Sequence, residues 1–298
     1  MIDKKMNVNA VNARRALVAC VGGGMLLTAW AAHAQSSAPS NEPTPPGTPW
    51  TVTGHAEVVS EYRFRGIDQT WGRPALQAGM DVSAASGWYA GTWLSNVSGH
   101  SYPGGSLEWD LYGGYNGKLT EDLGYTVGTY GYLYPGANTK HATCPSAAYA
   151  TPCGVPSQGF DTLEFNAGLS WKWLSYKLSW SATDYFGANH RTGYDGDTRG
   201  TLYHDLGLSW PLRDDLTLTA HIGRTQLRAN YGAVNPSYTD YRVGLAKTWD
   251  GGWNASLAWV KATNDRFYRP PTGGLSSANG DTRDLNRGQW VLQLGRTF

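Results

Sequence analysis

The sequence has little charge, few cysteines and almost no long apolar run. Asp, Glu, Lys and Arg make up 16% of 298 residues, and the formal net charge is +1. A nucleic-acid-binding domain would carry a clustered basic excess, so we predict no nucleic-acid partner. The mean hydropathy of −0.43 argues against a bundle of membrane helices. It permits a membrane β-barrel, whose strands place apolar residues singly between polar ones.

The sequence also lacks the short motifs of common enzymes and metal proteins. It contains no phosphate-binding loop, no HExxH and no EF-hand, so we predict no cofactor, no metal and no enzymatic activity. One enzymatic alternative stays open. Lipid-hydrolysing outer-membrane barrels carry a Ser–His pair at the lipid edge, and His204 falls on an apolar face of its segment. No Ser–His–acid arrangement stands out in the sequence beside it.

The first 34 residues have the features of an export signal. Arg14 and Arg15 precede an apolar stretch over 16–32, which ends in the small-residue site Ala32-His33-Ala34. This order predicts a signal peptide over 1–34 that is cleaved before Gln35. The alternatives are an anchoring helix, for which seventeen residues are short of the roughly 20 that a span needs, and lipidation at Cys20. Residues 35–50 are rich in Ser and Pro, and we expect a disordered leader there.

Cleavage would leave two of the three cysteines, Cys144 and Cys153. Both lie in one loop-like segment, and export past the inner membrane permits oxidation, so we predict a disulfide between them. Its stabilisation would be about 2–3 kcal/mol. A zinc site is the weaker alternative, because only His141 lies nearby and the spacing matches no zinc pattern.

From residue 51 onward, apolar residues recur with period two, which is the period of a β-strand. In the first segment, one face carries Val52, Gly54, Ala56, Val58, Ser60, Tyr62 and Phe64, and the other carries Thr53, His55, Glu57, Glu61, Arg63 and Arg65. The pattern recurs eleven more times, and the last run ends at Phe298. We therefore predict about twelve strands over 51–298.

The connections between these segments alternate strictly between long and short. The long ones are 66–73, 98–105, 135–159, 187–199, 228–237 and 264–287, and the intervening ones hold only a few residues. A soluble sandwich has no reason to sort loops in this way, whereas a membrane barrel has short periplasmic turns and longer outer loops. Lipid offers no hydrogen bonds to the backbone, so the sheet must close.

These patterns together predict a transmembrane antiparallel up-and-down β-barrel in the bacterial outer membrane, with both termini periplasmic. Aromatic residues stand near the ends of many segments, as an interfacial girdle requires; they are Tyr62, Tyr134, Trp171, Trp210, Trp249 and Trp253. The expected surroundings are outer-membrane lipid and lipopolysaccharide. The terminal Phe298 is similar to the signal that the barrel-assembly machinery recognises, although Arg296 stands where an apolar residue is usual.

Several stretches of the sequence resemble the TorF-like putative porins of proteobacteria. They are the segment Ser60-Glu61-Tyr62-Arg63-Phe64-Arg65-Gly66-Ile67 and the stretches 74–77, 86–97, 108–115, 132–136 and 181–187. The resemblance spans nearly the whole chain after residue 50. It implies an outer-membrane barrel with a channel role, and supplies no catalytic residue and no substrate. The 135–159 loop departs from the family pattern.

If the apolar face meets lipid, the polar face lines the lumen. Its candidate pore-lining charges are Glu57, Glu61, Arg63, Arg65, Asp81, Glu108, Asp110, Glu164, Lys172, Lys177, Asp205, Asp240 and Arg242. Charges of both signs at one height select ions and polar solutes. The acidic excess predicts a porin-like channel for small polar solutes or ions with a slight cation preference. The alternative is a non-conducting structural or receptor barrel, because twelve strands enclose a space that side chains can fill.

Overall fold

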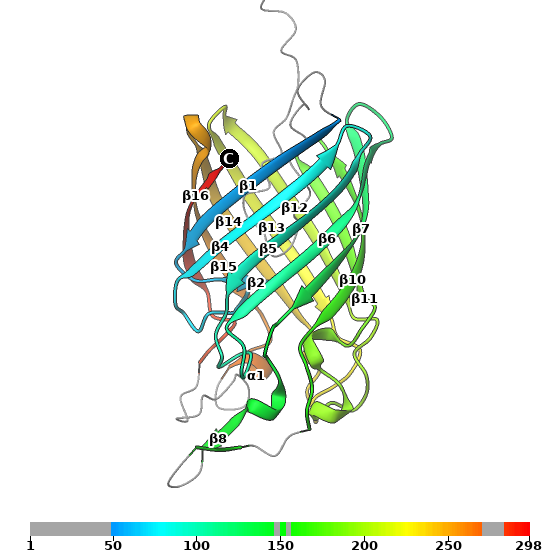
Figure 1. Ribbon diagram of the computed structural model, residues 1–298, viewed down its shortest axis with the longest axis vertical. Helices are drawn as coiled ribbons and strands as arrows, with labels where there is room; N and C mark the ends of the chain where they lie inside the picture. The colour runs from blue at the N-terminus through cyan, green and yellow to red at the C-terminus, as the bar shows by residue number, and fades with distance from the viewer. Residues whose placement is uncertain (1–48, 146–149, 153–155, 270–282) are drawn as a thin grey trace, which may run out of the picture.

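The computed structural model describes residues 49–145, 150–152, 156–269 and 283–298, and its main feature is a closed barrel of twelve antiparallel strands (Figure 1). The wall strands are β1 (Trp50–Val59), β4 (Ala75–Ala84), β5 (Trp88–Asn96), β6 (Leu107–Lys118), β7 (Leu123–Leu133), β10 (Thr162–Trp171), β11 (Leu174–Ser181), β12 (Leu202–Arg213), β13 (Leu216–Gln226), β14 (Tyr238–Thr248), β15 (Trp253–Ala262) and β16 (Gln289–Thr297). The predicted fold class and strand number are confirmed.

Short elements occupy the connections. Two small hairpins are formed by β2 (Arg63–Phe64) with β3 (Ile67–Asp68), and by β8 (Thr143–Pro145) with β9 (Ala150–Pro152). The helical turns are η2 (Thr139–His141), η3 (Tyr185–Gly187), η4 (His190–Thr192), η5 (Asp250–Gly252) and α1 (Asp265–Tyr268). In the described part of the chain, no helix is both long and apolar enough to cross a bilayer.

The barrel closes through its first strand. β1 pairs with β4 on one side, where Val52 lies opposite Val82, and with β16 on the other, where Val58 lies opposite Leu294. Each remaining strand pairs with its neighbours along the chain. Each wall strand therefore has a partner on both sides, which satisfies the backbone groups that lipid cannot.

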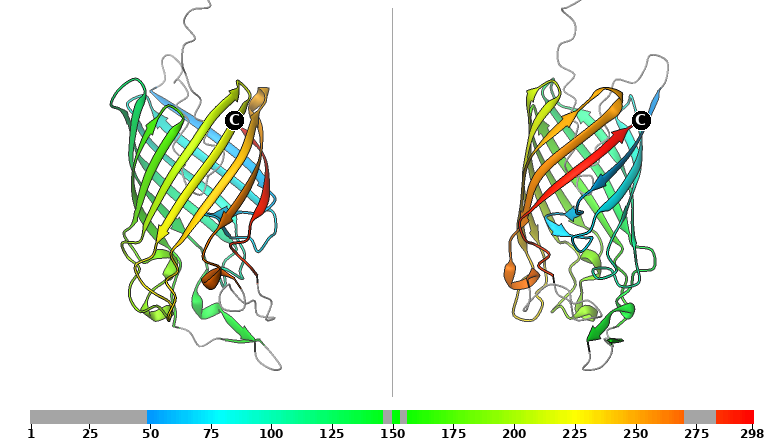
Figure 2. Two further views of the ribbon diagram at one scale, coloured as in Figure 1. Left: turned by 180° about the vertical axis from the view of Figure 1, so that it is seen from behind. Right: turned by 90° about the vertical axis from the view of Figure 1, so that its left-hand side faces the viewer.

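The two ends of the barrel differ. The start of β1 and the C-terminus lie at one end with the short turns, whereas the long connections, including β8 and α1, lie at the other (Figures 1 and 2). The predicted sorting of loop lengths is confirmed. We call these the short-turn end and the long-loop end.

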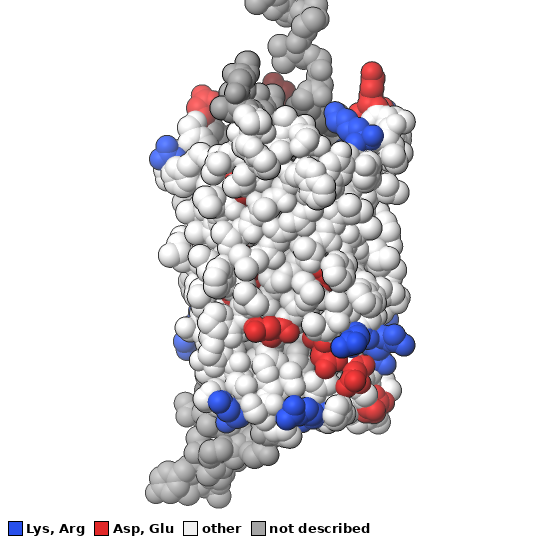
Figure 3. All heavy atoms as spheres, turned by 45° about the vertical axis from the view of Figure 1, so that its right-hand side comes forward, with Lys and Arg blue, Asp and Glu red and all other residues white. Residues whose placement is uncertain are grey.

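The outer surface of the barrel is an apolar belt. Outward side chains in mid-strand are exposed and apolar, among them Met80, Leu111, Val127, Leu169, Leu206, Val243 and Leu257. Charged side chains gather toward the two ends, and the middle band of the face in Figure 3 is nearly free of them. Trp171, Trp210, Trp249 and Trp253 are exposed near the short-turn end. Such a belt is stable only against lipid, so the barrel spans a membrane.

The first predicted strand is wrong at its far end. The period-two pattern predicts a strand that continues outward through Tyr62 and Phe64, but β1 ends at Val59. Both rings are buried inside the barrel, and so is Tyr134, which was also expected in the girdle. The reason is that β2 is itself a short strand, so its side chains alternate as those of a continuing strand do. The pattern alone does not distinguish the two.

Two substitutions to arginine test the position of the belt. Val243, in mid-strand, is 46% exposed, and Leu212, near the short-turn end, is 48% exposed. We expect Val243→Arg to lower the free energy of unfolding in lipid vesicles by about 2–4 kcal/mol, and Leu212→Arg by about 0–1 kcal/mol, because the cost of the charge depends on its depth. Denaturant titration measures both. Equal losses would contradict a belt centred on Val243.

Candidate functional site

The chain between β1 and β4, residues 60–74, folds into the barrel; we call it the inner hairpin (Figure 2). Phe64 pairs with Ile67 across a two-residue turn of Arg65 and Gly66, whose φ angles are 47° and 79°. Positive φ at both positions is the pattern of a type I′ turn. A Cβ on Gly66 would lie 2.7 Å from the Cβ of Asp240 on β14. The tip of the hairpin therefore rests against the inner wall.

Arg65 ties this tip to another part of the wall. Its guanidinium donates to Glu164 on β10, with Nη1–Oε1 2.9 Å and Nη2–Oε2 2.6 Å, and to the Tyr185 hydroxyl at 3.2 Å. It also lies 4.0 Å from the ring centroid of Tyr203. Burial is the largest single influence and disfavours the charged form, but Glu164, Tyr185 and Tyr132 together outweigh it and raise the pKa of Arg65 above its ordinary value. A bidentate pair of this kind fixes orientation as well as distance.

The base of the inner hairpin is held by the segment that precedes β16. Arg63 Nη1 donates to the carbonyl of Leu285 at 3.0 Å, and Arg283 Nε donates to Asp68 Oδ2 at 2.5 Å. Glu61 forms ion pairs with Arg63 and, at 3.3 Å, with Arg283. Burial is the larger influence on the pKa of Arg63 and lowers it, while Glu61 opposes the shift. Contacts with the segment before β16, which is distant in sequence, thus hold the base of the inner hairpin in place.

Aromatic side chains pack around the inner hairpin in the long-loop half of the barrel. Phe64 contacts Tyr132 with ring centroids 5.4 Å apart, and Tyr62 contacts Trp93 at 5.4 Å. The same buried cluster includes Tyr102, Tyr112, Tyr130 and Tyr134. The core of this protein therefore lies inside the barrel and not beneath its outer face.

Three carboxylates lie on the inner wall beside this cluster. Glu57, Glu108 and Asp110 are buried, and none pairs with Lys or Arg among the described residues. Gln293 Nε2 donates to Glu57 at 2.9 Å, and the Tyr130 hydroxyl donates to Asp110 at 2.9 Å. An amide group therefore contacts Glu57, and a phenol group contacts Asp110, in place of cations.

His221 joins two further acids across strands. Its Nδ1 lies 2.7 Å from Asp205 Oδ1 on β12, and its Nε2 lies 2.6 Å from Asp240 Oδ1 on β14. Two carboxylate acceptors require both ring nitrogens to donate, which makes this ring an imidazolium. Arg242 and Lys177 face the same interior without an ion pair in the described part of the chain.

Sequence reasoning found the charges of the interior but not all of their positions. Glu57, Glu108, Asp110, Glu164, Asp205, Asp240 and Arg242 lie on wall strands, whereas Glu61, Arg63 and Arg65 belong to the inner hairpin. Lys172 was wrongly placed in the lumen: it lies in a short turn, 37% exposed, and pairs with Asp122. The sequence pattern did not single out His221 or the tyrosine cluster, because alternation shows the face of a residue but not its partners on other strands. Whether these groups line a conducting path stays a prediction.

Two other expectations concern residues away from this interior. His204 lies on the outer face, where its Nδ1 is 2.8 Å from the Tyr176 hydroxyl, and no hydrogen bond in the described structure joins it to a serine. The predicted disulfide of Cys144 with Cys153 lies outside the described side chains, and the predicted signal peptide and most of the predicted leader lie outside the described residues. Among the described residues, no cluster of His, Cys, Asp and Glu could hold a metal.

The crowding at the hairpin tip predicts the outcome of a glycine substitution. Gly66→Ala brings both a positive φ and a clash, whereas Gly232→Ala brings a positive φ of 58° into open space. We expect the first to lower the free energy of unfolding by about 1–3 kcal/mol more than the second, because overpacking adds to the backbone cost. Denaturant titration in lipid vesicles measures both. Equal losses would show that the tip is not packed against β14.

In comparisons with known proteins, the chain matches one family model and is similar in structure to several outer-membrane barrels. No curated protein sequence matches the chain. Among solved structures, the KdgM porin in complex with disordered oligogalacturonate is similar with a TM-score of 0.47 and 8% identity, over 83% of this chain and 98% of that chain. The NanC porin gives 0.46 and 13%, over 83% and 99%. OmpT of Vibrio cholerae gives 0.38 and 8%, over 84% and 97%.

These likenesses concern the barrel as a whole and carry no information about a solute. The family comparison is more extensive, because residues 43–298 match one family model and so include every wall strand and the inner hairpin. On that match, the chain belongs to the Gcw_chp family, described as bacterial protein of unknown function.

Proposed function

We propose that this protein is an outer-membrane channel for passive diffusion of small polar solutes or ions, narrowed by its inner hairpin. The proposal rests on the difference in polarity between the outer and the inner face of the barrel. The outer face is an apolar belt, whereas the interior holds charged groups such as Glu57, Lys177 and Asp205. A barrel interior rich in charge selects by charge and size when solutes pass through it.

The inner hairpin sets the size limit of this channel. It crosses the interior from β1 to Glu164 on β10, and Tyr62, Phe64 and Arg65 fill space in the long-loop half. Twelve strands enclose a narrow space even without such a segment. The solutes are therefore small.

The orientation and the finer family assignment are parts of the same proposal. Short turns face the periplasm in outer-membrane barrels, so both termini are periplasmic and the long loops face outward. The inner hairpin is formed by the stretch 60–74, whose residues 60–67 resemble the TorF-like putative porins. Phe298, at the short-turn end, is the proposed contact of the assembly machinery.

A slight cation preference follows from the pairing of the interior charges. Arg65 is neutralised by Glu164, and His221 is neutralised by Asp205 and Asp240. Three acidic groups have no such partner among the described residues, namely Glu57, Glu108 and Asp110. Two basic groups, Arg242 and Lys177, also have none. Acidic groups are therefore in excess among the unpaired side chains of the interior, and this excess favours cations weakly.

The second candidate is a non-conducting structural or receptor barrel. One observation favours it: the hairpin and the aromatic cluster are nearly fully buried, with Arg65 only 2% exposed. A solute would pass this point only if the hairpin moved or a narrow path remained beside it. The lipid-enzyme alternative has less support, because His204 contacts a tyrosine.

Removal of the ion pair between Arg65 and Glu164, which holds the tip of the inner hairpin, distinguishes a channel from a structural barrel. We expect Arg65→Ala with Glu164→Ala to speed the swelling of proteoliposomes in small sugars, because the double change frees the tip without leaving an unpaired buried charge. The matched control, Lys172→Ala with Asp122→Ala, removes an exposed ion pair at the short-turn end and should not alter the rate. If proteoliposomes swell neither with the wild type nor with the variant that lacks Arg65 and Glu164, the channel proposal is overturned.

Reversal potentials in a salt gradient test the charge preference. We expect a slight cation preference for the wild type and a weaker one for Glu108→Gln with Asp110→Asn, since these changes remove two interior carboxyl groups while preserving side-chain size. Val58→Ala, on the outer face of β1, serves as the control without a charge change. A clear anion preference of the wild type would contradict the proposal.

A further inference from the structure

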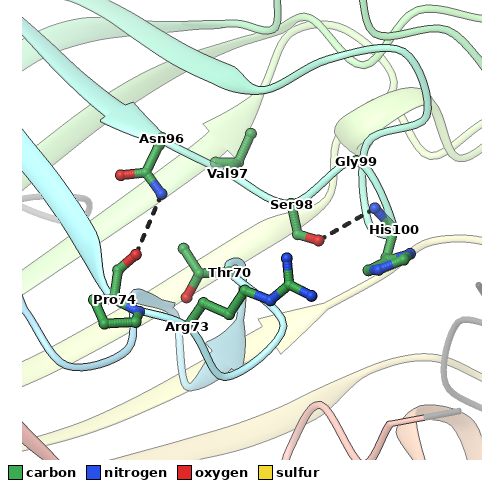
Figure 4. A pocket seen from close by; sticks show the side chains of 8 residues that line it. All are labelled: Thr70, Arg73, Pro74, Asn96, Val97, Ser98, Gly99 and His100. Carbon is green, nitrogen blue, oxygen red and sulfur yellow. Dashed lines mark hydrogen bonds between the residues drawn. The ribbon is translucent and has the colours of Figure 1, made fainter. Parts of the chain in front are cut away.

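A pocket of about 450 Å³ lies at the long-loop end between the β3–β4 and β5–β6 connections (Figure 4). Its wall includes Thr70, Arg73 and Pro74 from the first connection, Asn96 from the end of β5, and Ser98 and His100 from the second connection. The Arg73 side chain extends along the pocket toward Ser98 and His100 in Figure 4. The pocket is formed in part by the last residues of the inner hairpin, at the rim of the barrel, and it plays no part in the proposed channel.

The lining of the pocket is rich in hydrogen-bond donors. Arg73 forms no ion pair among the described residues, and no carboxylate lines the pocket. The Thr70 hydroxyl accepts from the backbone of Tyr62 at 3.1 Å, and the Ser98 hydroxyl accepts from the backbone of His100 at 3.2 Å. Each hydroxyl therefore keeps its hydrogen for another acceptor.

The remaining polar groups of the pocket are held in place. Asn96 Oδ1 accepts from the Leu76 amide at 2.7 Å, and its Nδ2 donates to the Pro74 carbonyl at 3.3 Å. The His100 ring packs against Trp71, with the two ring centroids 4.8 Å apart. A guanidinium with hydroxyl donors and no competing acid is the arrangement that binds a phosphate oxygen cluster.

The pocket stands directly above the lipid belt on the outside of the barrel. Pro74 and Asn96 are exposed on the same outward faces as Leu76 of β4 and Leu94 of β5, whose side chains are also exposed. Trp109 is exposed on the next strand, with its cross-strand partner Leu94 beside it. A basic pocket at this height meets the headgroup layer of the bilayer.

We propose that the Arg73 pocket binds the phosphate group of a lipid headgroup in the outer leaflet, with Arg73 as the charged ligand and Thr70, Ser98 and His100 as further hydrogen-bond donors. The belt below it accommodates the acyl chains of the same lipid. This continuity favours a lipid over a free phosphate ion, which would gain nothing from Leu76 and Leu94.

Native mass spectrometry of the purified full chain in detergent tests the site, with diphosphorylated lipid A as the probe. We expect Arg73→Ala to weaken binding about tenfold, the loss of one charge-assisted contact. Arg224→Ala is the matched control, because Arg224 is exposed near the same end of the barrel on β13 and makes a single hydrogen bond to Thr239. It should change binding less than twofold. A difference in gel migration between unheated and heated samples, equal to that of the wild type, verifies that both variants are folded.

A second arm separates the sources of phosphate. Lipid A stripped of its phosphates should bind the wild type as weakly as diphosphorylated lipid A binds Arg73→Ala, and inorganic phosphate should compete only at high excess. Inorganic phosphate that displaces lipid A at equal concentration would reassign the pocket to a free ion. Equal weakening by Arg73→Ala and Arg224→Ala would overturn the site, because rim charge in general would then explain the binding.

Discussion

The structure depends on the hydrogen-bonding needs of a backbone placed in lipid. Each N–H and C=O of a spanning strand must find a partner within the protein, because the hydrocarbon supplies none. The pairing of β1 with both β4 and β16 meets this need by removing both edges of the sheet. Closure then gives the sheet one face toward lipid and one toward an interior. Apolar residues occupy the first face, and polar residues must find partners on the second.

The inner hairpin supplies partners for polar residues on the interior face. Charges on a barrel interior are costly unless paired, and the ion pair of Arg65 with Glu164 joins a loop residue to the wall. Tyrosines serve the same purpose in another form, since their rings pack on Phe64 and Trp93 while a hydroxyl such as that of Tyr130 reaches a carboxylate. The long-loop half of the interior is therefore built like the core of a soluble protein. The headgroup-level pocket at Arg73 arises from the same loop, on its outward side.

Sequence patterns predicted the barrel well because its period is local. Val52, Ala56 and Val58 alternate with Thr53, His55 and Glu57 in the sequence and lie on opposite faces in the structure. They failed where the chain turned inward after Val59, since the short strand β2 alternates as a continuing β1 would. The predicted interior charges were found for the same local reason. Their partners were not, because Arg65 and Glu164 lie 99 residues apart.

The sequence by itself determined the class of fold, the number of strands and the face of each wall residue. These follow from side-chain alternation and loop length, which act over a few residues. Only the tertiary structure decided which charges meet, that the segment 60–74 fills the interior, and that Arg73 approaches Ser98 and His100. Such contacts depend on the register between strands and on loop closure. Both are set by the curvature of the whole barrel, which no short stretch of sequence contains.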